Sequence, residues 1–217
     1  HTPQADRAME ELCRTYWFPL YAYVRRRGHV KEDAEDLTQA FFARFLEKNY
    51  LEALSSERGR FRAFLLASLK HFLLNEWDKS QRQKRGGGQA HLSLDYQTAD
   101  TQFQIAGTAE PSPEKAFDRE WAVTLLARVI ERLGAEHQAG GKAGQFEQLK
   151  PFLTAGKGAV SHAEAAQKLG MDESAVRVAV HRLRKRYRQL LRDEIASTLS
   201  DPAQVDEEMR ALFGAFS

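Results

Sequence analysis

Apolar residues recur at helical spacing along most of this chain. They fall three or four residues apart from 5 to 27, from Asp33 to about Lys48, and from Phe61 to about Arg82. This spacing places apolar side chains on one face of a helix. Further helical patterns follow between 114 and 198, and no segment carries a strong strand signal. The pattern predicts an all-α fold.

The helical pattern breaks at Arg85. Three glycines at 86–88 open a stretch without a sustained period, which ends in E-P-S-P at Pro113. Glycine- and proline-rich composition of this kind is typical of linkers. We therefore expect two small helical domains joined by a flexible linker. The predicted boundaries are 1–85 for the first domain, 86–113 for the linker, 114–198 for the second domain, and 199–217 for a helical extension.

The second domain contains the pattern of a helix-turn-helix. Ser161 precedes a short apolar pattern and has Glu164 three residues on, which is a capping box. Gly170 then permits a sharp turn, because it lacks a side chain. Asp172 is placed to cap a second, longer helix. Two helices joined by a glycine turn predict a DNA-reading unit.

The longer helix of this motif has one apolar stripe and a strongly basic remainder. Val176, Val180 and Leu183 recur at helical spacing and are expected to face a core. The other faces carry Arg177, Arg182, Arg184, Lys185, Arg186, Arg188 and Arg192. A basic amphipathic helix is often only a solvated surface. The glycine turn, with the small Ala166 four residues before it, favours DNA binding here.

Charge and composition refine this picture. The 217 residues have a net charge of only +2, but acids cluster at 32–36 and bases cluster at 79–85 and 177–192. Such sorting indicates one surface for nucleic acid and another for a different partner. Cys13 is the single cysteine, which excludes an intramolecular disulfide. No apolar run approaches ~18 residues and no signal peptide is visible, so we expect a cytoplasmic protein without a membrane contact.

The sequence offers no arrangement of catalytic or metal-binding residues. The histidines are scattered, and His162-Ala163-Glu164 lacks the P-C-x-x-C partner that a zinc deaminase requires. Gly86–Gly88 follows a basic helix and lacks the G-K-[ST] ending of a phosphate-binding loop. We therefore expect no catalytic residues, no metal site and no cofactor, and the chain is not expected to be an enzyme.

Three motifs in order resemble the extracytoplasmic-function group of bacterial RNA polymerase sigma factors. Glu32–Phe42, E-D-A-E-D-L-T-Q-A-F-F, is similar to the family's D-A-E-D-L-x-Q-x-x-F signature. The segment from Phe61, F-R-A-F-L, resembles the F-R-x-W-L segment and the helix after it. Gly170–Arg186 resembles the segment that reads the minus-thirty-five element. The match covers nearly all of residues 5–195.

The resemblance implies a sigma-two domain followed by a sigma-four domain, with core RNA polymerase and promoter DNA as partners. An anti-sigma protein is a further partner that the family allows. The implied polymerase contacts are Asp33, Asp36, Leu37, Gln39 and Phe42. The implied minus-ten contacts are Arg58, Arg60, Phe61, Lys79 and Arg82. The implied minus-thirty-five contacts are Ser174, Arg177, Val178, His181, Arg182 and Lys185.

Several alternatives remain at this point. Phe64 stands where the family usually has tryptophan, and both Phe61 and Phe64 could be core residues instead of base contacts. A helix-turn-helix regulator that does not bind core polymerase is the main competing function. An enzyme acting on nucleic acid is a weaker one, because the sequence offers no set of metal ligands for such chemistry. Co-purification with core polymerase and a nuclease assay would separate these functions.

The family motifs do not account for the tail at 199–217. Asp201-Pro202 is a helix start. An apolar stripe follows at Val205, Met209, Leu212, Phe213 and Phe216, with Glu207, Glu208 and Arg210 on the other side. We expect this stripe to be buried. It either braces the second domain or docks between the two domains as an inhibitory tail.

Overall fold

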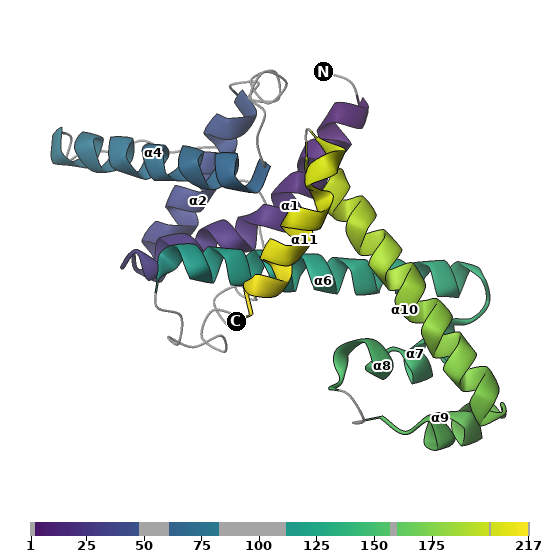
Figure 1. Cartoon of the computed structure of the whole chain (residues 1–217). Helices are drawn as coiled ribbons and strands as arrows, with labels where there is room; N and C mark the ends of the chain where they lie inside the picture. The colour runs from purple at the N-terminus through teal and green to yellow at the C-terminus, as the bar shows by residue number, and fades with distance from the viewer. Residues whose placement is uncertain (1–2, 48–60, 83–111, 157–159, 200, 217) are drawn as a thin grey trace. The chain divides into compact units, whose positions relative to one another are not determined.

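The structure is a computed structural model that describes residues 3–47, 61–82, 112–156, 160–199 and 201–216. The regular secondary structure in these residues is helical, which confirms the predicted all-α class (Figure 1). The helices are α1 (Pro3–Arg26), α2 (Lys31–Glu47), α4 (Phe61–Arg82), α6 (Pro113–Ala139), α7 (Ala143–Leu149), α8 (Pro151–Thr154), α9 (His162–Leu169), α10 (Glu173–Ala196), the short 3-10 helix η1 (Pro202–Gln204) and α11 (Val205–Gly214).

The chain divides into two compact units, but not at the predicted boundaries. The first unit comprises 1–123 together with 198–217, and the second comprises 124–197. The start of α6 belongs to the first unit because Phe117 and Trp121 are buried there. The second unit is therefore an insertion in the first. Of the predicted linker, residues 86–111 lie outside the described part of the chain.

The first unit has an aromatic core. The predicted stripe of α1 is confirmed at Tyr16 and Leu20, which are almost fully buried. The ring of Tyr16 meets that of Phe61 at a centroid distance of 5.2 Å, and Phe41 meets Phe72 at 5.7 Å, both edge to face. Aromatic pairs in this geometry stabilise a core beyond the area that they bury. These contacts join α1, α2 and α4.

In the second unit, α6 and α7 meet at a glycine. Gly134 of α6 lies against Phe146 of α7, where an added Cβ would come within 2.9 Å of the ring. Pro151 occupies the first turn of α8, and α7 ends at Leu149 just before it, so this segment forms two short helices. α9 and α7 both contact α10, which forms the long side of this unit.

The tail packs on the first unit, and not on the helix-turn-helix unit as one prediction held. Its buried residues are Val205, Glu208 and Leu212. The predicted face is thus rotated: Glu208 points inward, while Phe213 and Phe216 are about half exposed. The reason is the ion pair that Glu208 makes with Arg62 of α4. The predicted helix start is confirmed at Asp201, whose carboxylate accepts a hydrogen bond from the Ala203 N–H at 2.9 Å; Pro202–Gln204 forms a 3-10 turn that leads into α11.

Candidate functional site

The helix-turn-helix forms from the residues that predicted it. The Ser161 hydroxyl oxygen accepts a hydrogen bond from the Glu164 N–H at 3.3 Å and caps α9. Gly170 adopts a left-handed conformation with φ of 61°, which a side chain would disfavour. The Met171 N–H then returns to the Ala166 carbonyl at 3.0 Å, as in a Schellman turn. Asp172 stands at the N-cap position of α10 without a side-chain capping bond.

One face of α10 presents every residue that the resemblance assigned to upstream DNA. Val176, Val180 and Leu183 are buried, as predicted. The opposite face exposes Ser174, Arg177, Val178, His181, Arg182 and Lys185. These six positions recur three or four residues apart, so they line one side of the helix. We call this set the reading face.

The cations of α10 divide into engaged and available groups. Arg184 donates two hydrogen bonds to the Phe152 carbonyl, at 2.9 and 3.2 Å, so it ties α10 to α8. Arg177 pairs with Glu173 one turn earlier at 2.5 Å, in an exposed contact. Within the described residues, no hydrogen bond or ion pair engages Arg182 or Lys185. These two cations of the reading face are available for a phosphate or a base edge.

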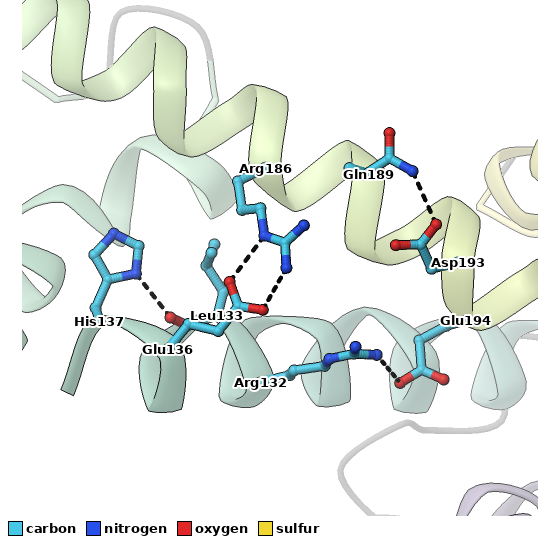
Figure 2. A network of polar contacts seen from close by, with 8 residues as sticks. All are labelled: Arg132, Leu133, Glu136, His137, Arg186, Gln189, Asp193 and Glu194. Atoms are coloured by element: carbon cyan, nitrogen blue, oxygen red, sulfur yellow. Dashed lines mark hydrogen bonds and ion pairs between the residues drawn. The ribbon is translucent and has the colours of Figure 1, made fainter. Parts of the chain in front are cut away.

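A network of polar contacts holds α10 against the part of α6 that belongs to the second unit (Figure 2). Arg186 donates two hydrogen bonds to the Glu136 carboxylate, at 2.6 and 2.8 Å. Arg132 approaches Glu194 at 3.5 Å farther along the same pair of helices. The hydrogen bonds from Arg186 lower the pKa of Glu136 below its ordinary value. This network uses part of the basic surface of α10 for structure.

An acidic cleft lies in the first unit. It has a volume of about 710 Å³ and lies among α1, α2, α4 and the start of α6. Asp33, Asp36 and Leu37 of α2 line it, together with Leu74 and Trp77 of α4. Leu74 and Trp77 are 58% and 62% exposed, respectively. Glu76 and Glu114 add acids to the lining, and Arg27 and Lys70 add bases. The cleft thus combines an excess of acidic side chains with apolar surface open to solvent.

The structure places the predicted polymerase contacts unequally. Asp33 and Asp36 are exposed, and Leu37 and Gln39 are half-buried. Phe42 is buried in the core at 2% exposure, so it offers no surface to a partner.

Sequence reasoning missed Leu74 and Trp77. The signal was present, because α4 carries more apolar residues than one buried face can cover. Apolar residues on a second face therefore had to meet either solvent or a partner.

The predicted minus-ten contacts are placed only in part. Phe61 is 6% exposed and packs against Tyr16 and Phe45, so it is a core residue in this structure. Its burial supports the alternative that it stabilises the fold. Lys79 and Arg82 lie in the last turns of α4, with side chains outside the described set. Arg58 and Arg60 lie outside the described residues.

A buried charge cluster around Arg62 was also missed. Its Nε donates to Glu208 Oε1 at 2.8 Å and its Nη1 donates to Asp118. The guanidinium lies over the Trp121 ring, 4.3 Å from the centroid. Burial acts to lower the pKa of Arg62, but the hydrogen bond to Glu208 and the charge of Asp118 raise it. The cation is therefore held charged inside the first unit.

Among the described residues, no helix combines the length and the apolarity that crossing a bilayer requires. In the same ranges, no three histidine, cysteine or acidic side chains are grouped so as to hold a metal ion.

Comparison with known proteins gives an independent view. Residues 13–83 match the family model of sigma-70 region 2, which covers most of α1 and all of α2 and α4. The chain is also 24% identical over 179 residues to the RNA polymerase sigma factor YlaC of Bacillus subtilis (strain 168). That alignment covers 82% of this chain and 88% of the relative. No solved structure matches the chain.

Proposed function

We propose how this chain, an RNA polymerase sigma factor of the extracytoplasmic-function type, divides its work between the acidic cleft and the reading face. As a sigma factor it directs transcription initiation with core RNA polymerase. The cleft of the first unit is assigned to core polymerase. The reading face of α10 is assigned to upstream promoter DNA.

The observation that carries the cleft assignment is the pairing of exposed acids with exposed apolar side chains. Asp33 and Asp36 stand beside Leu74 and Trp77, on two different helices of one cleft. Charge complementarity steers association and fixes orientation, while a buried aromatic residue supplies affinity. A polymerase segment with basic and apolar side chains fits such a cleft. We include Leu37, which lines the cleft, and the half-buried Gln39 of the same helix, and we leave out the buried Phe42.

The reading face is suited to the major groove, which is wide enough for an α-helix. Arg182 and Lys185 would approach phosphates or base edges, because neither cation is engaged within the described residues. Arg177 would exchange its exposed contact with Glu173 for DNA. Ser174, Val178 and His181 complete the proposed set. Bidentate arginine contacts to a base typically discriminate by about 1–3 kcal/mol.

For the downstream promoter element we propose Arg58, Arg60, Lys79 and Arg82 as contacts, through phosphates or unpaired bases. Phe61 is assigned instead to the core that positions α4. Catalysis would belong to the polymerase, and the sigma factor would have no catalytic residue. Its work would be in the cytoplasm, where polymerase and promoters are. An anti-sigma protein that competes for the same cleft fits this proposal.

The test is a titration of core RNA polymerase against variants of the cleft. Asp36→Lys should weaken core binding strongly, because it reverses a charge that lines the cleft. Glu32→Lys is the matched control: it makes the same charge change in the first turn of α2, at an exposed position that does not line the cleft. We expect near wild-type affinity for the control. Equal affinities for both variants would refute the cleft assignment.

The competing function, a helix-turn-helix regulator independent of polymerase, makes a different prediction. Such a protein would bind its DNA site equally well with or without core polymerase. Transcription from a pool of promoter fragments, with and without this protein, separates the two functions. New start sites that depend on this protein support the sigma factor.

A further inference from the structure

The charges on the exposed side of α10 differ between its first turns and its later turns. The first turn carries Glu173, whose carboxylate pairs with Arg177 one turn later at 2.5 Å. Farther along the helix, the exposed cations Arg182 and Lys185 have no acid three or four residues away on either side. The start of α10 therefore presents a pair of opposite charges, whereas its later turns present only positive charge to DNA.

This difference matters because the two regions of such a helix meet different parts of DNA. In a helix-turn-helix, the first turns of the second helix contact base edges, and residues around them contact phosphates. A phosphate that approaches Arg177 also approaches the carboxylate of Glu173, which repels it. Glu173 therefore disfavours a phosphate contact by Arg177, and no neighbouring acid of α10 does the same for Arg182 or Lys185.

The pair can nevertheless open at low cost. The side chains of Arg177 and Glu173 are 67% and 46% exposed, and exposed ion pairs contribute little to stability. When Arg177 turns to DNA, Glu173 needs a hydrogen-bond donor in its place. The amino groups of cytosine and adenine offer such a donor in the major groove, whereas a phosphate offers only acceptors. The pair thus distinguishes a base edge from the sugar-phosphate backbone.

We propose that Glu173 is a specificity-determining residue of this helix-turn-helix. It keeps Arg177 from binding phosphates, and the two side chains together recognise a guanine that lies beside a cytosine or an adenine. Arg177 donates to O6 and N7 of the guanine, and Glu173 accepts from the amino group of the neighbouring base. This inference rests on the proposed function of the reading face, and it names the base step that this face would recognise.

A simpler role for Glu173 makes a different prediction. An acid in the first turn of a helix is favoured by the helix dipole alone. In that case, replacing Glu173 by glutamine would alter the stability of α10 slightly. It would leave both the preference for one DNA sequence and the salt dependence of binding as they are in the wild type.

The test compares complexes of core RNA polymerase with the full-length chain. The wild-type complex first selects duplexes from a random pool. Binding of one selected duplex and one scrambled duplex is then measured across a range of salt concentrations for every variant. Because the polymerase is the same in each complex, its own DNA contacts cancel in the comparison.

Glu173→Gln keeps the shape of the side chain and removes its charge. It should tighten binding of the scrambled duplex and steepen the log–log salt dependence by about one, because Arg177 gains a phosphate. The preference for the selected duplex should fall by about tenfold. Glu131→Gln is the matched control, since it makes the same charge change at an exposed position of α6 in the second unit. The control should change the affinity for both duplexes by the same factor.

A double variant identifies the cation that is responsible. Arg177→Ala in the Glu173→Gln background should return the salt dependence to that of the wild type, because the cation that gained the phosphate is gone. A salt dependence that stays steep would mean that another cation made the new contact, and this would overturn the proposed coupling of Glu173 to Arg177.

Selection from the pool by each variant tests the base step itself. Wild type should enrich a guanine beside a cytosine or an adenine, and Glu173→Gln should keep the guanine and lose the preference at the neighbouring base. Identical selected sequences and equal salt dependence for the two proteins would overturn the inference and leave the reading face in place. If the wild-type complex selects no upstream sequence, the proposed function of the reading face fails, and the inference fails with it.

Discussion

The two units use the same chemistry, an arginine bound to carboxylates, in opposite settings. Arg62 and Glu208 are enclosed in the aromatic core of the first unit, with side chains 11% and 2% exposed. Arg186 and Glu136 lie on the surface of the second unit, at 45% and 36%. Exposed pairs contribute little because water and salt compete, whereas a buried pair penalises any arrangement that separates its charges. Because it is buried, the pair of Arg62 and Glu208 helps to determine where α11 packs on the first unit.

The pKa values of the carboxylates beside these two arginines shift in opposite directions. Burial raises the pKa of Asp118 beside Arg62, since desolvation disfavours the charged form. The exposed Glu136 shifts the other way, because hydrogen bonds from Arg186 lower its pKa. The two units should consequently respond to acid with opposite signs at these positions.

The largest effects are expected when a buried side chain is removed from each of the two parts of α6, one in the first unit and one in the second. Trp121→Ala removes a buried residue from the part of α6 that belongs to the first unit. We expect a loss of about 3–5 kcal/mol in unfolding free energy, from lost burial and a cavity. Hydrogen exchange should show the loss in α1 and α4.

Leu133→Ala is the matched change in the other part of α6, where Leu133 is fully buried in the second unit. It should cost about 2–5 kcal/mol and expose amides of α9 and α10 instead. If both variants loosened the same helices, the division of the chain at Val123 would be incorrect.

A smaller effect is expected at the turn of the helix-turn-helix. Gly170→Ala places a Cβ on a left-handed residue and should destabilise the second unit by about 1–2 kcal/mol. Gly144→Ala in α7 meets nothing within 4 Å and should be neutral or slightly stabilising. Thermal unfolding of both variants checks this. Equal melting temperatures would contradict the role of the turn.

The two caps of the same motif sharpen the comparison further. Ser161→Ala removes an observed capping bond and should cost about 1 kcal/mol. Asp172→Ala removes a side chain without such a bond, and so should cost less. Denaturant titration ranks the two. The reverse order would mean that Asp172 caps α10 in solution.

The smallest expected effect is the pH dependence of the surface pair. The pKa of Glu136 is lowered in the folded state, so its stabilising contribution is complete above its unfolded value of about 4.3. That contribution is lost as pH falls through the lowered folded value. Glu136→Gln should flatten the acid side of the stability curve of the second unit slightly. Asp118→Asn should act oppositely in the first unit, because the raised pKa of Asp118 makes its charge less favourable as pH rises.

Sequence reasoning succeeded where local chemistry decides the outcome. The cap at Ser161 and the turn at Gly170 were predicted to the residue. A glycine in a left-handed conformation and a serine cap are properties of a few consecutive residues, so they can be read without the fold.

It failed where distant residues decide. Glu208 was expected to face outward because glutamate usually does, yet its partner Arg62 lies 146 positions earlier. Likewise, Phe42 and Phe61 belong to the motifs that predicted partner contacts, yet both are buried in the core. A motif does not show which of its aromatic residues are buried. The helical period of a sequence identifies the apolar face of a helix, but it does not identify the residues that this face contacts.

The insertion of one unit within the other also constrains synthesis of the protein on the ribosome. The second unit has all its residues once Ser197 has been made, and it can fold then. The first unit begins earlier, but Glu208 reaches Arg62 only after the entire second unit has been translated. Nascent chains generally fold domain by domain from the N-terminus, exposing incomplete cores to aggregation. In this protein the first unit emerges first from the ribosome but is completed last. The surface on which α11 packs therefore stays exposed until residues 198–217 have been made.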